Sequence, residues 1–477
     1  MTKDSKIIVI GSGAFGISAA YHLSEGGYTN ITVFDKGDYN HNLFDPLKGA
    51  NAPSTDYNKL VRASYIDKTH YQNLALQSLQ IYYKWNEQLE HAAFLPNGLK
   101  NTDKIFRNTG YVRFDDVENK EEAKTLAHFE KQGLRSFEYD INNEDDILRS
   151  KITGWYSKID PLGQKGKVKT LTGVLDSIAG VVNANKGLLW LKYLSERSGN
   201  VKFVFGPLHG EIEKIIYSDD TKIKAVGVQT KDGKKHDADF VVIAAGGYTP
   251  AFLPSEKRDR IESVASTIIF LQIPHDRPDL LKKYQNIPMI NWRMRYQENI
   301  VKDGIYMFPA TEEGIIKIGA NDELWRYFDE NNETLKNVST PTDKFKLLPK
   351  ESFESYKTFF SQWLKDLKDA NVHIEKSKFC FDAISQKNEF VIDFVPGTEN
   401  VIISSGGSFH GFKFLPVIGR FVEGLISEKN YQYSEYFKLD SIKDNDFDRK
   451  PLKDVYSDHS LKYAGLVERK QYYFEIR

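Results

Sequence analysis

The sequence predicts an α/β fold in which a domain built on a parallel sheet is interleaved with a second domain. Three observations predict it: a βαβ pattern with a glycine motif at the start of the chain, a buried strand before a glycine pair near residue 246, and a similar strand near residue 402. Segments 91–160 and 251–370 differ, because they are rich in charged and aromatic residues. Since sheet-like segments flank this material, we expect interleaved rather than consecutive domains.

The first 35 residues have the pattern of a βαβ unit. The run Lys6–Ile10 is β-branched, which is typical of a strand buried on both faces of a parallel sheet. A helix is predicted over Ile17–Glu25, ending at Gly26-Gly27. The next strand, Ile31–Phe34, leads directly into Asp35. This order is the context that a dinucleotide-binding motif requires.

The motif itself is Gly11-Ser12-Gly13-Ala14-Phe15-Gly16, and Asp35 follows its first glycine by 35 − 11 = 24 residues. Gly11 permits a tight turn, Gly13 lets the backbone approach a pyrophosphate, and Gly16 allows close helix–sheet packing. The helix N-terminus would present free N–H groups to the phosphates, and Asp35 would accept hydrogen bonds from ribose hydroxyls. An ordinary strand-to-helix turn is the alternative interpretation.

Two later segments extend the predicted parallel sheet. Asp239–Gly247 is a buried strand followed by two glycines, preceded by a hairpin of Ile223–Thr230 and Lys235–Asp239 around Lys231-Asp232-Gly233. Val401–Gly407 has the same strand-to-glycine character. Strands that end in small residues suit close approach of the backbone to a ligand, although a plain strand end is the alternative.

Composition excludes several classes of function. The 477 residues include 65 Lys+Arg and 66 Asp+Glu, and a net charge of −1 argues against a nucleic-acid-binding surface over the whole protein. The single cysteine, Cys380, rules out an intramolecular disulfide and a cysteine-rich metal site. We expect no metal and no membrane partner. A signal-peptide pattern, a run of roughly 20 apolar residues and a C-terminal peroxisomal signal are all missing, which favours a cytoplasmic protein.

Three further stretches narrow the prediction. They are Ser54–Arg62, the pair Phe379-Cys380-Phe381-Asp382 and Phe390–Asp393, and Gly406–Gly419 with Gly411-Phe412-Lys413-Phe414-Leu415-Pro416 at its centre. With the N-terminal motif they resemble the flavin-dependent amine oxidases of the sarcosine oxidase and N-methyltryptophan oxidase superfamily, and within it the fungal fructosyl-amino-acid oxidases, or amadoriases. The resemblance covers residues 6 to about 425.

The resemblance implies FAD as the cofactor and a division of the chain. A Rossmann-like FAD-binding domain would take residues 1–90, 165–250 and 375–430. An α+β substrate domain on an antiparallel sheet would take 91–164 and 251–374, and 431–477 would form a C-terminal tail. Cofactor contacts are expected at Gly11, Gly13, Ala14, Phe15, Gly16, Asp35, Lys36, Ser54, Asn58, Lys59, Cys380, Gly411, Phe412 and Lys413.

The same resemblance implies individual roles. Cys380 matches the cysteine that carries the flavin 8α-methyl group as a thioether; a buried small apolar residue is its ordinary interpretation. Lys413 matches the lysine that pairs with the substrate carboxylate. Lys317 resembles the lysine beside flavin N5, where a cation stabilises charge on reduced oxygen; an outward strand residue is the alternative. His410, next to Lys413, is a predicted active-site donor.

The remaining implied residues follow the family pattern less closely. Glu323 lies near the amadoriase glutamate that contacts substrate, but two extra residues separate it from Lys317, so Asp322 could take its place. Arg62 lies in a stretch that runs near the flavin, and surface charge is its alternative interpretation. Arg449 is a candidate for a substrate-binding arginine in the tail.

The predicted function is an FAD-dependent oxidase that cleaves the secondary-amine C–N bond of fructosyl amino acids, giving glucosone, the free amino acid and hydrogen peroxide. Its partners would be a glycated amino acid and oxygen. The alternative substrates are saccharopine, pipecolate or sarcosine. Two other classes stay open: a NAD-dependent dehydrogenase with the same glycine motif, and a non-enzymatic flavin-binding or interaction protein.

Overall fold

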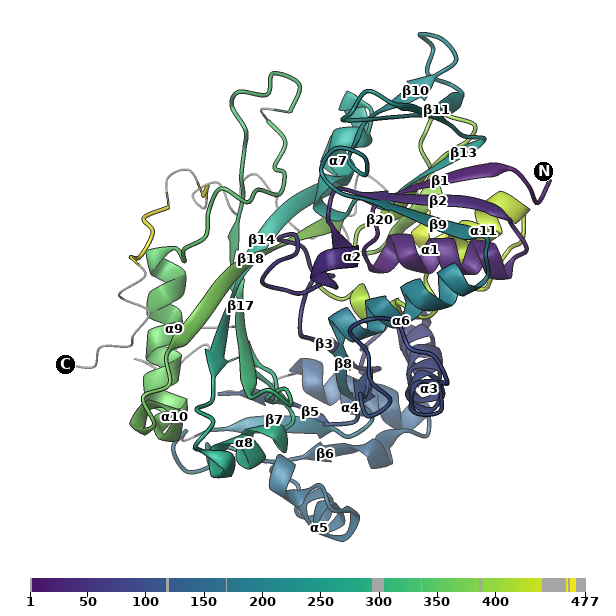
Figure 1. Cartoon of the computed structure of the whole chain (residues 1–477). Helices are drawn as coiled ribbons and strands as arrows, with labels where there is room; N and C mark the ends of the chain where they lie inside the picture. The colour runs from purple at the N-terminus through teal and green to yellow at the C-terminus, as the bar shows by residue number, and fades with distance from the viewer. Residues whose placement is uncertain are drawn as a thin grey trace.

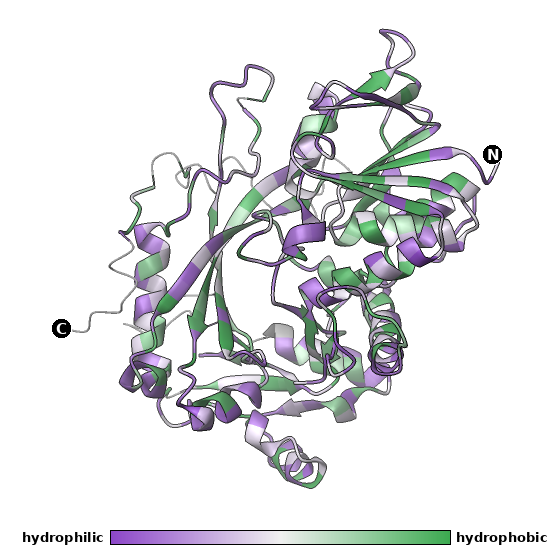
Figure 2. Ribbon diagram, in the orientation of Figure 1, coloured by the Kyte–Doolittle hydropathy of each residue, from purple (hydrophilic) through white to green (hydrophobic). Residues whose placement is uncertain are grey.

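The computed structural model describes residues 2–116, 120–168, 170–293, 304–335, 337–385, 388–439, 460–461 and 464–468, without the side chains of residues 120, 121 and 321–323. Two large sheets dominate these residues and lie at opposite ends of the molecule (Figure 1). Hydrophobic residues concentrate in the strands and on the helix faces that cover them (Figure 2).

The first sheet has six strands in the order β19-β20-β13-β1-β2-β9. Its neighbours pair in parallel except at the β19 edge. The strands are β1 (Lys6–Ile10), β2 (Asn30–Asp35), β9 (Val201–Phe205), β13 (Phe240–Ile243), β19 (Val391–Phe394) and β20 (Val401–Ser405). The predicted parallel sheet is therefore confirmed.

Both faces of this sheet are covered, which explains its β-branched strands. The helices α1 (Ala14–Glu25), α6 (Ala184–Arg197) and α11 (Arg420–Ser427) lie on one face (Figure 1). The other face packs against a small sheet of β10 (Ile212–Tyr217), β11 (Ala225–Thr230) and β12 (Lys235–Asp237). The predicted hairpin is the β11–β12 pair. Alternate residues of each central strand, such as Val9 and Ile8 in β1, enter the two different cores.

The second sheet has eight strands in the order β18-β14-β17-β16-β15-β5-β7-β6, antiparallel except for the β15–β5 pair. The strands are β5 (Tyr111–Asp115), β6 (Glu138–Asp140), β7 (Thr172–Asp176), β14 (Ile261–Gln272), β15 (Met289–Arg293), β16 (Ile305–Met307), β17 (Ile315–Trp325) and β18 (Ile374–Ser385). Its outer face is apolar and packs against α9 (Lys350–Trp363), α10 (Lys365–Asp369) and α8 (Pro278–Gln285). The inner face is left for a ligand.

Shorter elements join the two sheets. A three-stranded sheet contains β3 (Asn58–Val61), β8 (Gly180–Asn183) and β4 (Phe106–Arg107). The long helix α3 (Thr69–Glu90) and the helices α2 (Tyr39–Asn42), α4 (Lys120–Lys131), α5 (Glu144–Thr153) and α7 (Thr249–Phe252) complete the main elements. The chain passes repeatedly between the two large sheets: β1, β2, β9, β13, β19 and β20 belong to the six-stranded sheet, whereas β5–β7 and β14–β18 belong to the eight-stranded sheet.

The exact domain division stays a prediction, but two strands pair outside the domain to which their residue numbers assigned them. β7 and β18 fall within the ranges expected for the FAD-binding domain, yet both are hydrogen-bonded into the eight-stranded sheet.

None of the helices within the described ranges combines the length and apolar character needed to cross a bilayer.

Candidate functional site

The glycine motif forms the turn between β1 and α1. Gly11 has φ +102°, and a Cβ at this position would lie 2.4 Å from the Ala244 carbonyl oxygen at the end of β13. The helix begins at Ala14, three residues before the predicted start, so its N-terminal turn lies within the motif. The Ala14 N–H donates a hydrogen bond to Ser54 Oγ at 3.0 Å. The motif therefore has the close packing and exposed backbone that a pyrophosphate requires.

Asp35 lies at the end of β2 beside this turn. Its carboxylate accepts hydrogen bonds from Ser12 N–H at 2.7 Å, Ser12 Oγ at 2.9 Å and Gly37 N–H at 2.8 Å. Burial raises the pKa of Asp35. Since a carboxylate has about four acceptor sites, capacity remains for a ribose hydroxyl. The neighbouring Lys36 donates to the Tyr248 hydroxyl at 2.7 Å.

A cavity of about 940 Å³ extends from this turn to the inner face of the eight-stranded sheet. Most predicted site residues line it: Gly11, Gly13, Ala14, Phe15, Asp35, Lys36, Ser54, Lys59, Arg62, Lys317, Cys380, His410, Gly411, Phe412 and Lys413. Gly16 and Asn58 pack behind the lining, Gly16 against the Gly11 carbonyl and Asn58 through a carbonyl that accepts from Lys317. The side chains of Glu323 and Asp322, and all of Arg449, lie outside the described residues.

The lining fits an FAD. A Cβ added to Gly411 would lie 2.7 Å from the Phe15 ring, so the segment after β20 approaches the glycine motif closely. The lining thus combines a glycine turn at a helix N-terminus, which suits phosphates, with the lysines Lys36, Lys59, Lys317 and Lys413. Within the described residues, no group of three or more His, Cys, Asp or Glu side chains could hold a metal ion.

Lys317, on β17, belongs to a compensated charge cluster at the middle of the cavity. Its ammonium lies 2.5 Å from Asp56 Oδ2 and 4.6 Å from the centre of the Phe308 ring. Lys59 lies 2.8 Å from the same Asp56 oxygen. Burial lowers the pKa of Lys317 to about 8. Burial would raise the pKa of Asp56, but Lys317, Lys59 and Lys378 together hold it at about 2. The Lys317 ammonium is therefore held in one position by an ionised partner.

Cys380 lies on β18, opposite Ser266 of β14, and is buried against Ile268 and Phe270 at the cavity lining. Burial raises the pKa of its thiol. The free protein therefore holds Cys380 as a neutral thiol rather than a thiolate. Nearby, Asp382 accepts hydrogen bonds from the Phe409 N–H at 2.6 Å and the Ala383 N–H at 2.8 Å, and burial raises its pKa to about 6.

Lys413 lies in the short helical turn Phe412–Phe414 and has no acidic partner. Its ammonium donates to the Tyr65 hydroxyl at 3.0 Å and to the His410 carbonyl at 2.9 Å, and among the described residues no carboxylate pairs with it. Burial, followed by the charge of Arg62, lowers the pKa of Lys413 well below its ordinary value. A buried cation without a counter-ion is costly, so an anionic ligand would stabilise this site.

Both ring nitrogens of His410 are engaged within the protein. Nδ1 lies 3.2 Å from the Tyr65 hydroxyl and Nε2 lies 3.0 Å from the Asn388 carbonyl oxygen. A carbonyl can only accept, so we assign the ring proton to Nε2, and Tyr65 then donates to Nδ1. Burial, followed by the Lys413 charge, lowers the pKa of His410 well below its ordinary value. His410 is thus placed to orient Tyr65 and, through it, Lys413.

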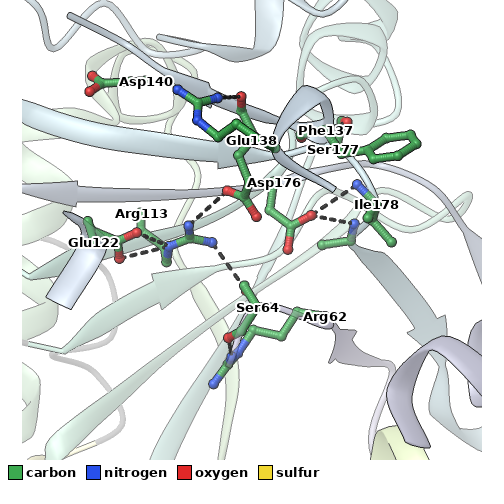
Figure 3. Close-up of polar contacts among 12 residues, drawn as sticks. Arg62, Ser64, Arg113, Glu122, Phe137, Glu138, Asp140, Asp176, Ser177 and Ile178 are labelled. Carbon is green, nitrogen blue, oxygen red and sulfur yellow. Dashed lines mark hydrogen bonds and ion pairs between the residues drawn. The ribbon is translucent and has the colours of Figure 1, made fainter. Parts of the chain in front are cut away.

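The motifs did not predict a charged wall of the cavity, which contains Arg113, Glu122, Asn291 and Arg293. Figure 3 shows Arg113 and Glu122 of this wall with their partners. Arg113 on β5 donates through Nε to both Glu122 oxygens, at 2.9 and 3.0 Å, and through Nη2 to Glu138 at 3.1 Å. Its Nη1 lies 3.4 Å from Ser64 Oγ. Arg113 is therefore fixed from three sides.

A pair of buried carboxyl groups lies behind Arg113. Glu138 and Asp176 are direct partners across β6 and β7, and Figure 3 shows their carboxyl groups facing each other. Asp176 Oδ1 accepts from the Ile178 and Ala179 N–H groups at 3.0 and 3.1 Å. Glu138 Oε1 and Asp176 Oδ2 have no hydrogen-bond partner among the described residues. Burial raises the pKa of Glu138 to about 8, and Asp176 adds to the rise, so Glu138 is protonated at neutral pH.

Asp56, Tyr65, Arg113 and Glu122 were not predicted as site residues. Asp56 lies within the stretch Ser54–Arg62 that carries the family resemblance, so its presence there was a usable signal. Tyr65, Arg113 and Glu122 have no local motif, and their place in the site depends on strand pairing and on the approach of distant segments.

The chain matches the family described as FAD dependent oxidoreductase over residues 6–425 and belongs to it. The fold and site are thus those of an FAD-dependent oxidoreductase, and FAD is its cofactor. Neither a nicotinamide-dependent dehydrogenase nor a non-enzymatic interaction protein describes it. The expected membership in the superfamily that includes amine oxidases is confirmed by the relatives below.

Among curated relatives, L-saccharopine oxidase of Schizosaccharomyces pombe is 27% identical and is aligned over 87% of this chain and 88% of its own length. Monomeric sarcosine oxidase of a Bacillus species is 22% identical over 89% and 93%. The solved structure of fructosyl peptide oxidase from E. terrenum superposes with a TM-score of 0.74 at 21% identity, covering 99% of this chain and 100% of its own. The solved structure of amadoriase II from Aspergillus fumigatus superposes with a TM-score of 0.71 at 21% identity, covering 96% of this chain and 94% of its own. These likenesses confirm the fold class.

Proposed function

We propose that this chain is an oxidase of N-substituted α-amino acids, with a secondary amine as the reacting group and oxygen as the acceptor. The observation that carries the proposal is Lys413, a buried lysine in the cavity wall without a carboxylate partner among the described residues, which an anionic ligand would charge. Arg62 adds a second cation to this end of the cavity. A substrate carboxylate would neutralise both and hold the adjacent C–N bond in place.

The proposed reaction converts the amine, oxygen and water into a carbonyl compound, a free amine and hydrogen peroxide. The FAD that this site would hold would supply the two-electron oxidation of the C–N bond and the reduction of oxygen to hydrogen peroxide. Lys413 and Arg62 orient the carboxylate, and Tyr65 and His410 hold Lys413. Lys317, kept in position by Asp56, supplies the positive charge that stabilises the anion formed from oxygen. Water then hydrolyses the imine.

Fructosyl amino acids are the first candidate substrates, with glucosone, the free amino acid and hydrogen peroxide as products. The fold likeness to fructosyl peptide oxidase and amadoriase supports them. Saccharopine is the second candidate, supported by the relative of that specificity that is 27% identical. Glu323 or Asp322, Arg449, and a cytoplasmic location stay predictions.

We also propose that Cys380 carries the flavin through a thioether to its 8α-methyl group. The supporting observation is that this thiol lines the cavity, where Lys59 and Lys378 favour its thiolate against the opposing effects of burial, Asp56 and Asp382. After acid precipitation, yellow colour should remain with the wild-type protein and be released from Cys380→Ser. Colour that stays with the Cys380→Ser protein would contradict the assignment.

A peroxide assay on the purified holoenzyme tests the proposed function. The substrates are fructosyl-valine, ε-fructosyl-lysine, saccharopine, pipecolate and sarcosine. Peroxide release with at least one of them, and competitive inhibition by a short carboxylic acid that lacks an amine, is the expected result. A holoenzyme that contains FAD but releases no peroxide with any secondary amine would refute the proposal.

A further inference from the structure

The charged wall is built from one face of two paired strands together with Glu122 of α4. Asn291 and Arg293 on β15 are in register with Arg113 and Asp115 on β5. Because alternate residues of a strand point to the same side, these four side chains share the inner face of the sheet. Asn291, Arg293, Arg113 and Glu122 of α4 all line the cavity. The wall and Lys413 therefore line the same cavity.

Arg293 is the accessible cation of this wall. Its Nη2 donates to Asp115 at 2.7 Å and to Glu122 at 2.5 Å, while its Nε has no partner among the described residues. The Arg293 side chain is 22% exposed, against 6% for Arg113. Arg113 spends its donors on Glu122, Glu138 and Ser64, whereas the unpartnered Nε of Arg293 is buried, so only a group that enters this wall could satisfy it.

Acceptors stand beside this donor. Asn291 donates through Nδ2 to the Tyr111 hydroxyl at 3.3 Å, but its Oδ1 has no hydrogen-bond partner within the described ranges. Glu122 is ionised, because Arg113 and Arg293 outweigh its burial and lower its pKa to about 2. The wall thus offers an unspent guanidinium donor, an unspent amide acceptor and a carboxylate within one patch.

The charges of the patch select the chemistry of its ligand. Arg113 and Arg293 are balanced by Glu122 and Asp115. A ligand with a carboxylate alone would be repelled by Glu122 and Asp115, and one with an ammonium alone would be repelled by the two arginines. An apolar group would leave the unpartnered atoms of Arg293 and Asn291 without hydrogen bonds. A group with adjacent charges of both signs, such as the α-ammonium and α-carboxylate of an amino acid, satisfies donors and acceptors together.

The wall and the Lys413 end belong to one site. Ser64 contacts Arg113 through its hydroxyl and accepts from Arg62 through its carbonyl. The next residue, Tyr65, binds Lys413. The segment Ser64-Tyr65 therefore contacts both the wall and Lys413, and both line the same cavity of about 940 Å³.

We propose that this wall binds the zwitterionic α-amino-acid end of a diamino acid whose side-chain nitrogen is the amine oxidised, so that the substrates are N6-carboxyalkyl-lysines. This inference rests on the proposed function, since it takes Lys413 as the site of the other carboxylate. Saccharopine, named by the 27% identical relative, is a molecule of this class, whereas fructosyl-valine has a sugar in place of the second amino-acid end.

Three synthetic amines test the inference on the wild-type holoenzyme. N6-carboxymethyl-lysine has both ends, N-pentylglycine lacks the zwitterion, and Nα-acetyl-N6-carboxymethyl-lysine lacks only its ammonium. We expect kcat/KM, from peroxide release, to be about tenfold or more higher for the first than for either of the others. Equal values for the three would overturn the inference while leaving the proposed function intact. No peroxide from these or from fructosyl-valine and sarcosine would overturn both.

Variants locate the preference on the wall. In Arg293→Met the ratio of kcat/KM for N6-carboxymethyl-lysine over N-pentylglycine should fall towards one, and Arg293→Lys should restore part of it because the charge returns. Arg277→Met is the matched control, since Arg277 pairs with Asp279 on the surface and lies outside the cavity lining. A preference that survives in Arg293→Met, with flavin content and melting temperature unchanged, would overturn the inference. The wild-type comparison stands even if that variant does not fold.

Discussion

The two buried lysines of the cavity differ in how the protein treats their charge. Lys317 shares Asp56 with Lys59, whereas Lys413 has hydrogen bonds to Tyr65 and a carbonyl but no carboxylate among the described residues. Burial lowers the pKa of both, to about 8 for Lys317 and well below the ordinary value for Lys413. A compensated lysine keeps its charge without a ligand, while an uncompensated one gains its charge when an anion binds.

The largest expected effect follows from removing the uncompensated lysine. Lys413→Met should lower kcat/KM for N-substituted amino acids about 100-fold or more, because a charge-assisted contact to the carboxylate is lost. Most of the loss should appear in KM, and steady-state peroxide release measures it. Lys413→Arg serves as the charge-conserving control. Near-normal kinetics in Lys413→Met would remove this residue from the site.

The compensated lysine should affect a different step. Lys317→Met should slow the reaction of the substrate-reduced enzyme with oxygen about tenfold or more, since a positioned cation is lost, while substrate binding changes less. Stopped-flow traces of flavin absorbance separate the two half-reactions. If reduction by substrate slowed as much as reaction with oxygen, Lys317 would have a general structural role.

The lowered pKa of Lys413 also predicts that anion binding depends on pH. Lys413 is neutral in the free enzyme above its lowered pKa, so a carboxylate must bring a proton with it. The inhibition constant of a short carboxylic acid should therefore rise, by up to about tenfold per pH unit, as pH increases above that pKa. Calorimetry in buffers of different ionisation enthalpy should show proton uptake on binding. In Lys413→Arg, which stays charged, both effects should disappear.

The smallest expected effect concerns Glu122 and Glu138, two buried acids that differ in whether they are ionised. Glu122 is ionised between two arginines, and Glu138 is protonated beside Asp176. At pH 7 Glu138→Gln should raise the free energy of unfolding, because Glu138 must take up a proton on folding whereas a glutamine is neutral in both states. Glu122→Gln should cost about 3 kcal/mol, because it leaves two arginines without their shared partner.

The pH dependence of unfolding checks the Glu138 assignment. A carboxyl group whose folded pKa is raised loses stabilisation as pH rises from its ordinary pKa towards about 8. The increase in the free energy of unfolding caused by Glu138→Gln should therefore be smaller at pH 5 than at pH 8, as measured by denaturant titration. An equal difference at both pH values would mean that Glu138 is ionised in the folded protein.

Several features were readable from the sequence because they are local. The glycine motif, the strands on either side of it and Asp35 all lie within the first 35 residues. The motifs around Cys380 and Lys413 also belong to single segments. These local patterns predicted the parallel sheet, the family and the cofactor correctly.

Tertiary structure alone decided how the charges are paired. Lys317 meets Asp56 across 261 positions and Lys413 meets Tyr65 across 348, so no local pattern shows that one lysine is compensated and the other is not. The wall of Arg113, Glu122 and Arg293 likewise exists because β5 and β15 pair in one register. The sequence by itself indicated a dinucleotide, since a glycine turn is a short-range structure, and the family resemblance of its later motifs indicated FAD. Folding determined which ligand charges the cavity accepts, because electrostatic balance depends on distance in space rather than along the chain.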